Sequence, residues 1–200
     1  MTPTDALNQD LSFSETLKYY SRKTHDSVDN LVMSMQPFAD LDNYAKFLQA
    51  QYEFHRTLKS AYQDDSLNEQ IPNLATLSRL DKVVADMQDL SVEPSDIALK
   101  QPNIEVEQAV GWLYCAEGSN VGAAILYKEA GKIKLSDEYG ASHLAAHPDG
   151  RMPHWRAFKT TLDNLALTDG QKAQALLGAD EAFAYFKHLI REIYTPIAVV

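Results

Sequence analysis

The sequence predicts an all-α fold in a single domain. Apolar residues recur every three or four positions along most of the chain, and capping-box patterns stand at Ser12–Glu15 and Thr168–Gln171. No segment alternates apolar and polar residues in the way that a half-buried strand does. With 200 residues, 45% of them hydrophobic, the chain is long enough to bury a sizeable core. We expect one domain over residues 1–200, with its core at about 12–195.

Prolines and polar segments separate the predicted helices. The first helix follows the capping box and ends before Pro37, and the second begins at Asp42. A third follows Pro72, and the longest ends at Gly131. The last helix has an interruption near Gly178. The predicted helices span about 13–35, 42–63, 74–87, 104–128, 153–165 and 168–193, and the segments 91–101 and 136–153 are predicted as loops.

One predicted helix carries two glycines, Gly118 and Gly122, in its interior. Each costs about 1 kcal/mol relative to alanine, so the pair needs a compensating reason. Residues four apart share a helix face, and Gly111, Cys115 and Ser119 lie nearby on the helical wheel. This strip of small residues predicts either close contact with a neighbouring helix or contact with a flat ligand.

The charge and composition exclude several functional classes. A formal charge of −10 repels nucleic acid and anionic membranes, so an anionic ligand needs local lysines or arginines. Cys115 is the single cysteine, which fits a reducing compartment. Residues 1–10 do not resemble a targeting signal, and no stretch approaches the roughly 20 apolar residues that span a bilayer. We expect a cytoplasmic protein that binds neither nucleic acid nor membrane.

His25 is the histidine that most suggests chemistry. It shares the helical spacing of Val28 and Val32, which places it toward the apolar side of its helix. Such a histidine is either a buried imidazole with a hydrogen-bond partner or an axial ligand of a metal or haem. Lys18 lies seven residues earlier, which places it about 20° from His25 around the helix and about 10 Å along the axis. It is either a cation that, with His25, suits a ligand with a metal centre and an anionic edge, or an ordinary exposed lysine.

The other histidines give weaker signals. His55 follows Phe54 in the second helix and is predicted to be structural. None of the remaining four shares a spacing typical of metal ligands. These are His143, His147, His154 and His188.

Several segments resemble bacterial haem oxygenases, in the order that this family shows. Residues 24–39, 42–47 and 51–52 are similar to the part of the family that binds the proximal side of haem. Residues 117–124 resemble the distal helix, and residues 139–144 resemble the segment after it. The similarity spans most of positions 12 to 190.

The resemblance implies roles for individual residues. His25 is then the proximal iron ligand, and Gly118 and Gly122 form the distal strip that lets haem and dioxygen approach the backbone. Ser119 stands where the eukaryotic pattern has an aspartate that anchors distal water, which leaves the proton route open. Glu117 and Asn120 contribute only if they turn toward the pocket.

The resemblance also implies residues that bind the rest of the ring. Lys18 matches a lysine that binds a haem propionate, and Lys159 falls near the second propionate cation, although Arg156 is equally within reach. Tyr114, four residues before Gly118, either lines the distal pocket or packs in the core.

The activity implied is oxidative cleavage of haem to biliverdin, carbon monoxide and ferrous iron, with haem as both substrate and cofactor and dioxygen as co-substrate. Family members that cut at unusual meso positions have lysines where this chain has Met33 and Glu129. Because Lys18 matches the members that cut at the α position, we expect the α isomer of biliverdin. No flavin or nicotinamide fingerprint is present, so a separate reductase or ferredoxin must supply electrons. The alternatives are a haem carrier or sensor that leaves the ring intact, and a helical interaction domain without haem.

Overall fold

A computed structural model describes residues 1–96 and 101–195, and within these ranges it is helical, with two isolated bridges near Ser136. The all-α prediction is confirmed. The elements in chain order are α1 Pro3–Leu7, α2 Phe13–Ser34, α3 Leu41–Thr57, α4 Lys59–Gln63, α5 Asp65–Gln70, the 3-10 turn η1 Leu74–Leu77, α6 Leu80–Asp89, α7 Val106–Lys132, the 3-10 turn η2 Ser142–Leu144, α8 Arg151–Asp163 and α9 Asp169–Tyr194.

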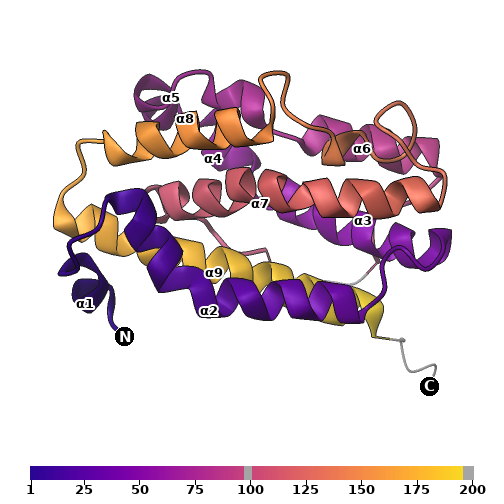
Figure 1. Ribbon diagram of the computed structural model, residues 1–200, viewed down its shortest axis with the longest axis horizontal. Coiled ribbons are helices and arrows are strands. Elements are labelled where there is room, and N and C mark those ends of the chain that lie inside the picture. Colours follow the sequence, from indigo (N-terminus) through magenta and orange to yellow (C-terminus); the bar gives the residue numbers. More distant parts are fainter. Residues whose placement is uncertain (97–100, 196–200) are drawn as a thin grey trace.

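The helix α9 is the platform on which the domain is built. The helices α2, α3 and α7 all pack on α9, whereas α2 and α7 contact each other little. Figure 1 shows α2 and α9 side by side along the long axis of the molecule, with α7 running in the same general direction. The helix α8 packs on both α7 and α2. The long helices α2 and α7 therefore share α9 as their support and make few contacts with each other.

The packing of α7 on α9 depends on small residues. A Cβ at Gly111 would lie 1.9 Å from the carbonyl oxygen of Ala175, and a Cβ at Gly178 would lie 2.2 Å from that of Gln108. The Cys115 thiol donates a hydrogen bond of 3.3 Å to the carbonyl of Ala179. At Gly111 and Cys115, the strip of small residues therefore serves close contact with a neighbouring helix, which was one of its two predicted roles.

The predicted helix 42–63 is divided in two at Leu58, between α3 and α4. Just before the division, the Thr57 hydroxyl donates to the carbonyl of Glu53, an interaction that tends to bend helices. The predicted third helix is also divided, because Ser78 is extended between η1 and α6. The short helices α1 and α5 are additional to the prediction.

The predictions near Gly131 and Gly178 were wrong. The helix α7 runs through Gly131 to Lys132, and Lys134 rather than the glycine takes the left-handed conformation after it (φ 67°). The helix α9 continues through Gly178 without interruption, because that glycine serves the contact with α7. The helix α8 begins at Arg151, two residues earlier than predicted.

Residues 91–96 are non-helical, as predicted, and residues 97–100 of that predicted loop lie outside the described part of the chain. Among the helices that the structure describes, none combines the length and the apolarity needed to cross a bilayer.

The substitution Gly178→Ala should lower the free energy of unfolding by about 2 kcal/mol or more, because the new methyl meets backbone atoms that cannot move aside. The matched control is Gly131→Ala, where a Cβ has no neighbour within 4 Å and the change should stabilise the helix by up to about 1 kcal/mol. Urea unfolding measures both values. Equal effects of the two substitutions would contradict the close crossing of α7 and α9.

Candidate functional site

The helix α2 presents His25 at the edge of the core. The capping box at Ser12 starts the helix, and Leu17, Val28 and Val32 are buried along it. The His25 ring stacks on Phe183 of α9, with 4.9 Å between ring centroids. Half of the His25 side chain is nevertheless exposed (51%), and its Nε2 lies 3.4 Å from Asp29 Oδ2.

The exposure of His25 corrects one prediction. We expected the residue on the apolar side of the helix, but half of its side chain is exposed although its ring stacks on Phe183. The interpretation as a buried structural histidine is therefore wrong. An imidazole that is held on one side and open on the other can bind a ligand.

Two predicted cations belong to neighbouring helices. Lys18 is exposed on α2, and Lys159 of α8 lies with its Nζ 5.9 Å from the centre of the Trp155 ring. The helices α2 and α8 are joined where the Ser14 N–H and hydroxyl both donate to the carboxylate of Asp163, at 2.6 and 3.1 Å. This contact places positive charge from both helices at the same end of the domain.

The predicted distal glycines have different surroundings. A Cβ at Gly118 would lie 3.2 Å from the Trp155 ring, whereas a Cβ at Gly122 would have no neighbour within 4 Å. Tyr114 is buried, and its ring centre lies 5.3 Å from that of Trp155. Ser119 is exposed, with its hydroxyl donating to the carbonyl of Ala116 at 2.7 Å. The open backbone is therefore at Gly122, and Gly118 is partly covered by α8.

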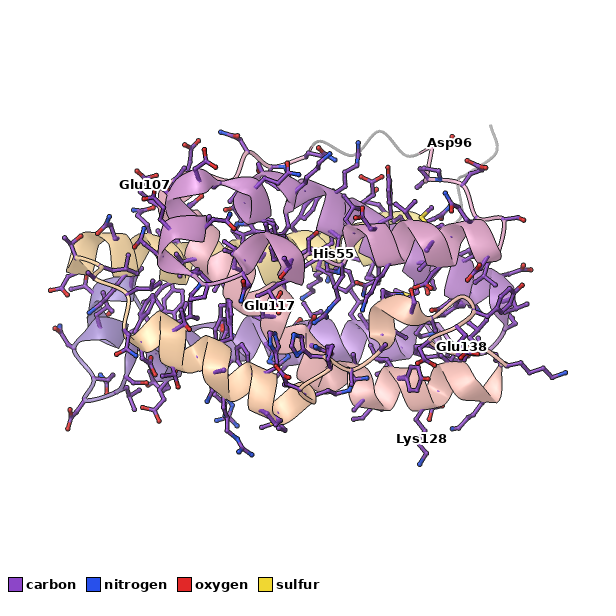
Figure 2. The ribbon with its side chains drawn as sticks, turned by 90° about the horizontal axis from the view of Figure 1, so that it is seen from above. His55, Asp96, Glu107, Glu117, Lys128 and Glu138 are labelled. Carbon is purple, nitrogen blue, oxygen red and sulfur yellow. The ribbon has the colours of Figure 1, made fainter. Side chains whose placement is uncertain are left out.

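The sequence reasoning missed a polar cluster inside the molecule behind α7. Glu117 is only 1% exposed and accepts hydrogen bonds from the Tyr62 hydroxyl (2.6 Å) and His154 Nε2 (2.9 Å). An Arg79 Nη2 lies 4.0 Å from the same carboxylate. Figure 2 shows Glu117 and His55 in the interior, between the helices. One signal was available, since Glu117 is the only charged residue in the apolar run around it.

A second buried pair joins α6 to η2. Asp86 Oδ2 lies 2.6 Å from His143 Nδ1, and the backbone N–H groups of Ser142 and His143 also donate to this carboxylate. Burial opposes the charge of Asp86, but these hydrogen bonds outweigh it and lower its pKa. Burial lowers the pKa of His143 despite its partner. The neutral ring thus donates through Nδ1 and keeps a buried Nε2 without a partner in the structure.

His55 lies close to this cluster and is fully buried. Burial lowers its pKa to about 3, and the positive charge of Arg79 acts in the same direction. Its Nδ1 also has no partner in the structure. Two buried ring nitrogens without partners are typical sites for internal water.

A third polar contact holds the glycine-bearing part of α7. Arg151 donates to both the carbonyl oxygen and the side-chain oxygen of Asn120, at 2.7 and 2.6 Å, and to the carbonyl of Leu144. His147 stacks on His154 with 4.0 Å between ring centres. The last histidine, His188, is exposed beside Glu192.

The chain is similar to known haem oxygenases over almost its whole length. The haem oxygenase family profile matches residues 11–192. Haem oxygenase PigA of Pseudomonas aeruginosa is 35% identical over 183 residues, covering 90% of this chain and 92% of PigA. The NO- and CO-bound haem oxygenase of Neisseria meningitidis is 48% identical, with a TM-score of 0.90 over 95% of this chain and 96% of that one. Haem oxygenase-1 of Synechocystis sp. PCC6803, solved with haem, shares the fold at 17% identity and a TM-score of 0.73, over 91% and 92% of the two chains.

The buried histidine should make the fold sensitive to acid. The pKa of His55 is about 3 in the folded state and about 6.5 in an unfolded chain, so the unfolded state binds more protons between these values. The free energy of unfolding is therefore not reduced by this group above about pH 6.5. Below that pH it decreases as the pH falls, by at most about 1.4 kcal/mol per pH unit for His55. Urea unfolding between pH 7 and pH 4 measures the slope, which His55→Gln should make shallower.

The control for this measurement is His188→Gln, because the His188 side chain is about half exposed. It should leave the slope as in the wild type. A slope in His55→Gln equal to that of the wild type would contradict the assignment of acid sensitivity to His55.

Proposed function

The chain belongs to the haem oxygenase family, and from this premise we propose that it binds haem between α2 and α7, with His25 as the iron ligand. Haem oxygenase activity, the oxidative cleavage of haem, follows from the family membership. The proposal concerns the residues that perform it. Haem is the substrate, and it also supplies the iron at which dioxygen is activated.

The observation that carries the proposal is the combination of His25 and Gly122 on two helices that share α9 as their support. His25 offers a half-exposed imidazole, and Gly122 offers backbone with open space beside it. Because α2 and α7 pack on α9 rather than on each other, a flat molecule can enter between them. We therefore assign these two surfaces to the two faces of the porphyrin.

The chain's own residues have distinct roles in this arrangement. The His25 imidazole would hold the iron without the electron donation that a thiolate provides for O–O cleavage. Gly118 and Gly122 keep side chains away from the other face of the ring, which leaves room for dioxygen directed along the ring. The Ser119 hydroxyl can bind water there. Protons then arrive through water held by backbone and side-chain groups.

Charge at the α2–α8 end of the domain suits the propionates of haem. Lys18 and Lys159 are the cations that we assign to them, with Arg156 as the alternative to Lys159. Tyr114 lines this end beside Trp155. Met33 is exposed and Glu129 pairs with Lys132, so neither position offers a positive charge that would hold the ring in a rotated orientation. We therefore propose that the product is the α isomer of biliverdin.

Electrons must come from a partner, and we propose a separate reductase or ferredoxin. The competing proposal is a carrier or sensor that binds haem without degrading it, since His25 would serve both functions. We favour degradation because the backbone at Gly122 is open, whereas a carrier gains nothing from leaving room for dioxygen.

The direct test is aerobic turnover of the haem-loaded protein with a generic electron donor. The Soret band should disappear, and chromatography should identify one biliverdin isomer, the α isomer. A mixture of isomers would contradict the assignment of Lys18 and Lys159. A stable ferrous-oxy or ferric complex that survives the reaction would instead support the carrier.

The substitution Gly122→Leu should leave the fold intact but strongly reduce haem turnover, because its side chain enters the space that we assign to haem and dioxygen. The matched control is Gly131→Leu on the same helix, which also has no neighbour within 4 Å and should keep wild-type turnover. Haem titration and thermal unfolding separate loss of binding from loss of fold. Wild-type turnover in Gly122→Leu would place the substrate elsewhere.

A further inference from the structure

Glu117 stands directly beside a glycine of the proposed distal strip. It precedes Gly118 in the middle of α7, where residues 109–116 are all buried and uncharged. A carboxylate is costly in such surroundings unless hydrogen bonds satisfy it. The burial of Glu117 therefore requires an explanation, and the proposed distal strip of Gly118 and Gly122 does not provide one.

Three other elements supply partners for this one carboxylate. Tyr62 of α4 donates to Oε1, His154 of α8 binds Oε2, and Arg79, which precedes α6, lies 4.0 Å away. Burial, together with the nearby carboxylate, raises the pKa of Tyr62 well above its usual range. Its hydroxyl therefore stays protonated and donates to Glu117 at neutral pH. Both carboxylate oxygens are thus occupied by protein groups.

The contact with α8 involves two consecutive residues on each helix. His154 binds Glu117, and the next residue, Trp155, covers the backbone of Gly118. The same part of α8 carries Lys159, which lies over the Trp155 ring. Since Glu117 and Gly118 point about 100° apart on the helix, these contacts fix the rotation of α7 about its axis.

We propose that Glu117 is a positioning residue of the reaction: through Tyr62 and His154 it fixes the rotation of α7, and so determines which meso carbon of haem is attacked. This inference rests on the proposed function for the location of haem. It assigns Glu117 no contact with the substrate. A rotation of α7 by a few degrees would move the backbone at Gly118 and Gly122 across the ring.

Two substitutions at Glu117 separate positioning from proton donation. Glu117→Gln can accept a hydrogen bond from Tyr62 and donate one to His154, but it has no acidic proton. Glu117→Leu has a similar volume and makes neither hydrogen bond. If the residue acts by position, Gln should behave like the wild type and Leu should not.

The matched control is Glu53→Leu, which removes another buried carboxylate with an arginine partner, on α3. This control shows what general destabilisation does without a change at α7. If Glu117→Leu does not fold, Tyr62→Phe removes one hydrogen bond to Glu117 and takes its place.

Three measurements are made on each variant. They are the ratio of biliverdin isomers after turnover, the C–O stretching frequency of the ferrous haem–CO complex, and amide hydrogen exchange of residues 111–126 in the haem-free protein. Glu117→Leu should give mixed isomers, a shifted or broadened C–O band, and exchange faster by about tenfold or more. Glu117→Gln and Glu53→Leu should match the wild type in isomer ratio and C–O band.

Two results would overturn the inference. One is a wild-type isomer ratio and C–O band in Glu117→Leu. The other is a Gln variant that loses turnover as fully as the Leu variant while its exchange is unchanged, because that result assigns proton donation to Glu117. If the wild-type protein leaves haem intact, the proposed function fails, and the C–O band and hydrogen exchange still decide the positioning role.

Discussion

The helices α7 and α9 approach each other so closely that neither Gly111 nor Gly178 has room for a Cβ. This backbone contact fixes where α7 crosses its support. Because α2 packs on the same helix, α9 also sets the separation between α2 and α7. The proposed binding of haem between α2 and α7 needs a fixed distance between these helices, and close backbone packing holds such a distance better than flexible side chains do. The proposed haem site therefore depends on the glycine crossing, in which Gly111 lies about two turns before Gly118 and about three before Gly122.

Hydrogen bonds of buried polar side chains fix α7 further, in addition to its close crossing with α9. Close packing sets the distance of α7 from α9, and the hydrogen bonds of Glu117 and Asn120 connect the middle of α7 to α4, α8 and the segment near Leu144. The two unpartnered nitrogens of His55 and His143 belong to the same buried polar region. The middle of α7 is thus rich in hydrogen bonds at Glu117 and Asn120, while the backbone at Gly122 has open space beside it. This asymmetry allows one helix to be held firmly and still offer open backbone to a substrate.

The sequence predicted the helical class, five of the long helices and the family, because helical periodicity and capping boxes are local signals. It misjudged Gly131 and Gly178, since a glycine that ends a helix and a glycine that admits a neighbouring backbone look the same in one dimension. It also placed His25 on the apolar side, because the helical wheel cannot show that half of this side chain remains exposed beside Phe183. The partners of Glu117 could not be predicted from the sequence, because Tyr62 and His154 are 55 and 37 residues away and no local pattern connects them to Glu117.

The account depends most on the nitrogen of His25 as the ligand of the haem iron. The most direct measurement is the visible and resonance Raman spectrum of haem-loaded His25→Ala, with and without added imidazole. The variant should lose the iron–histidine signature and its turnover, and imidazole should restore the wild-type spectrum by occupying the vacated space. A His25→Ala spectrum identical to that of the wild type, without imidazole, would show that another group binds the iron and would contradict the account.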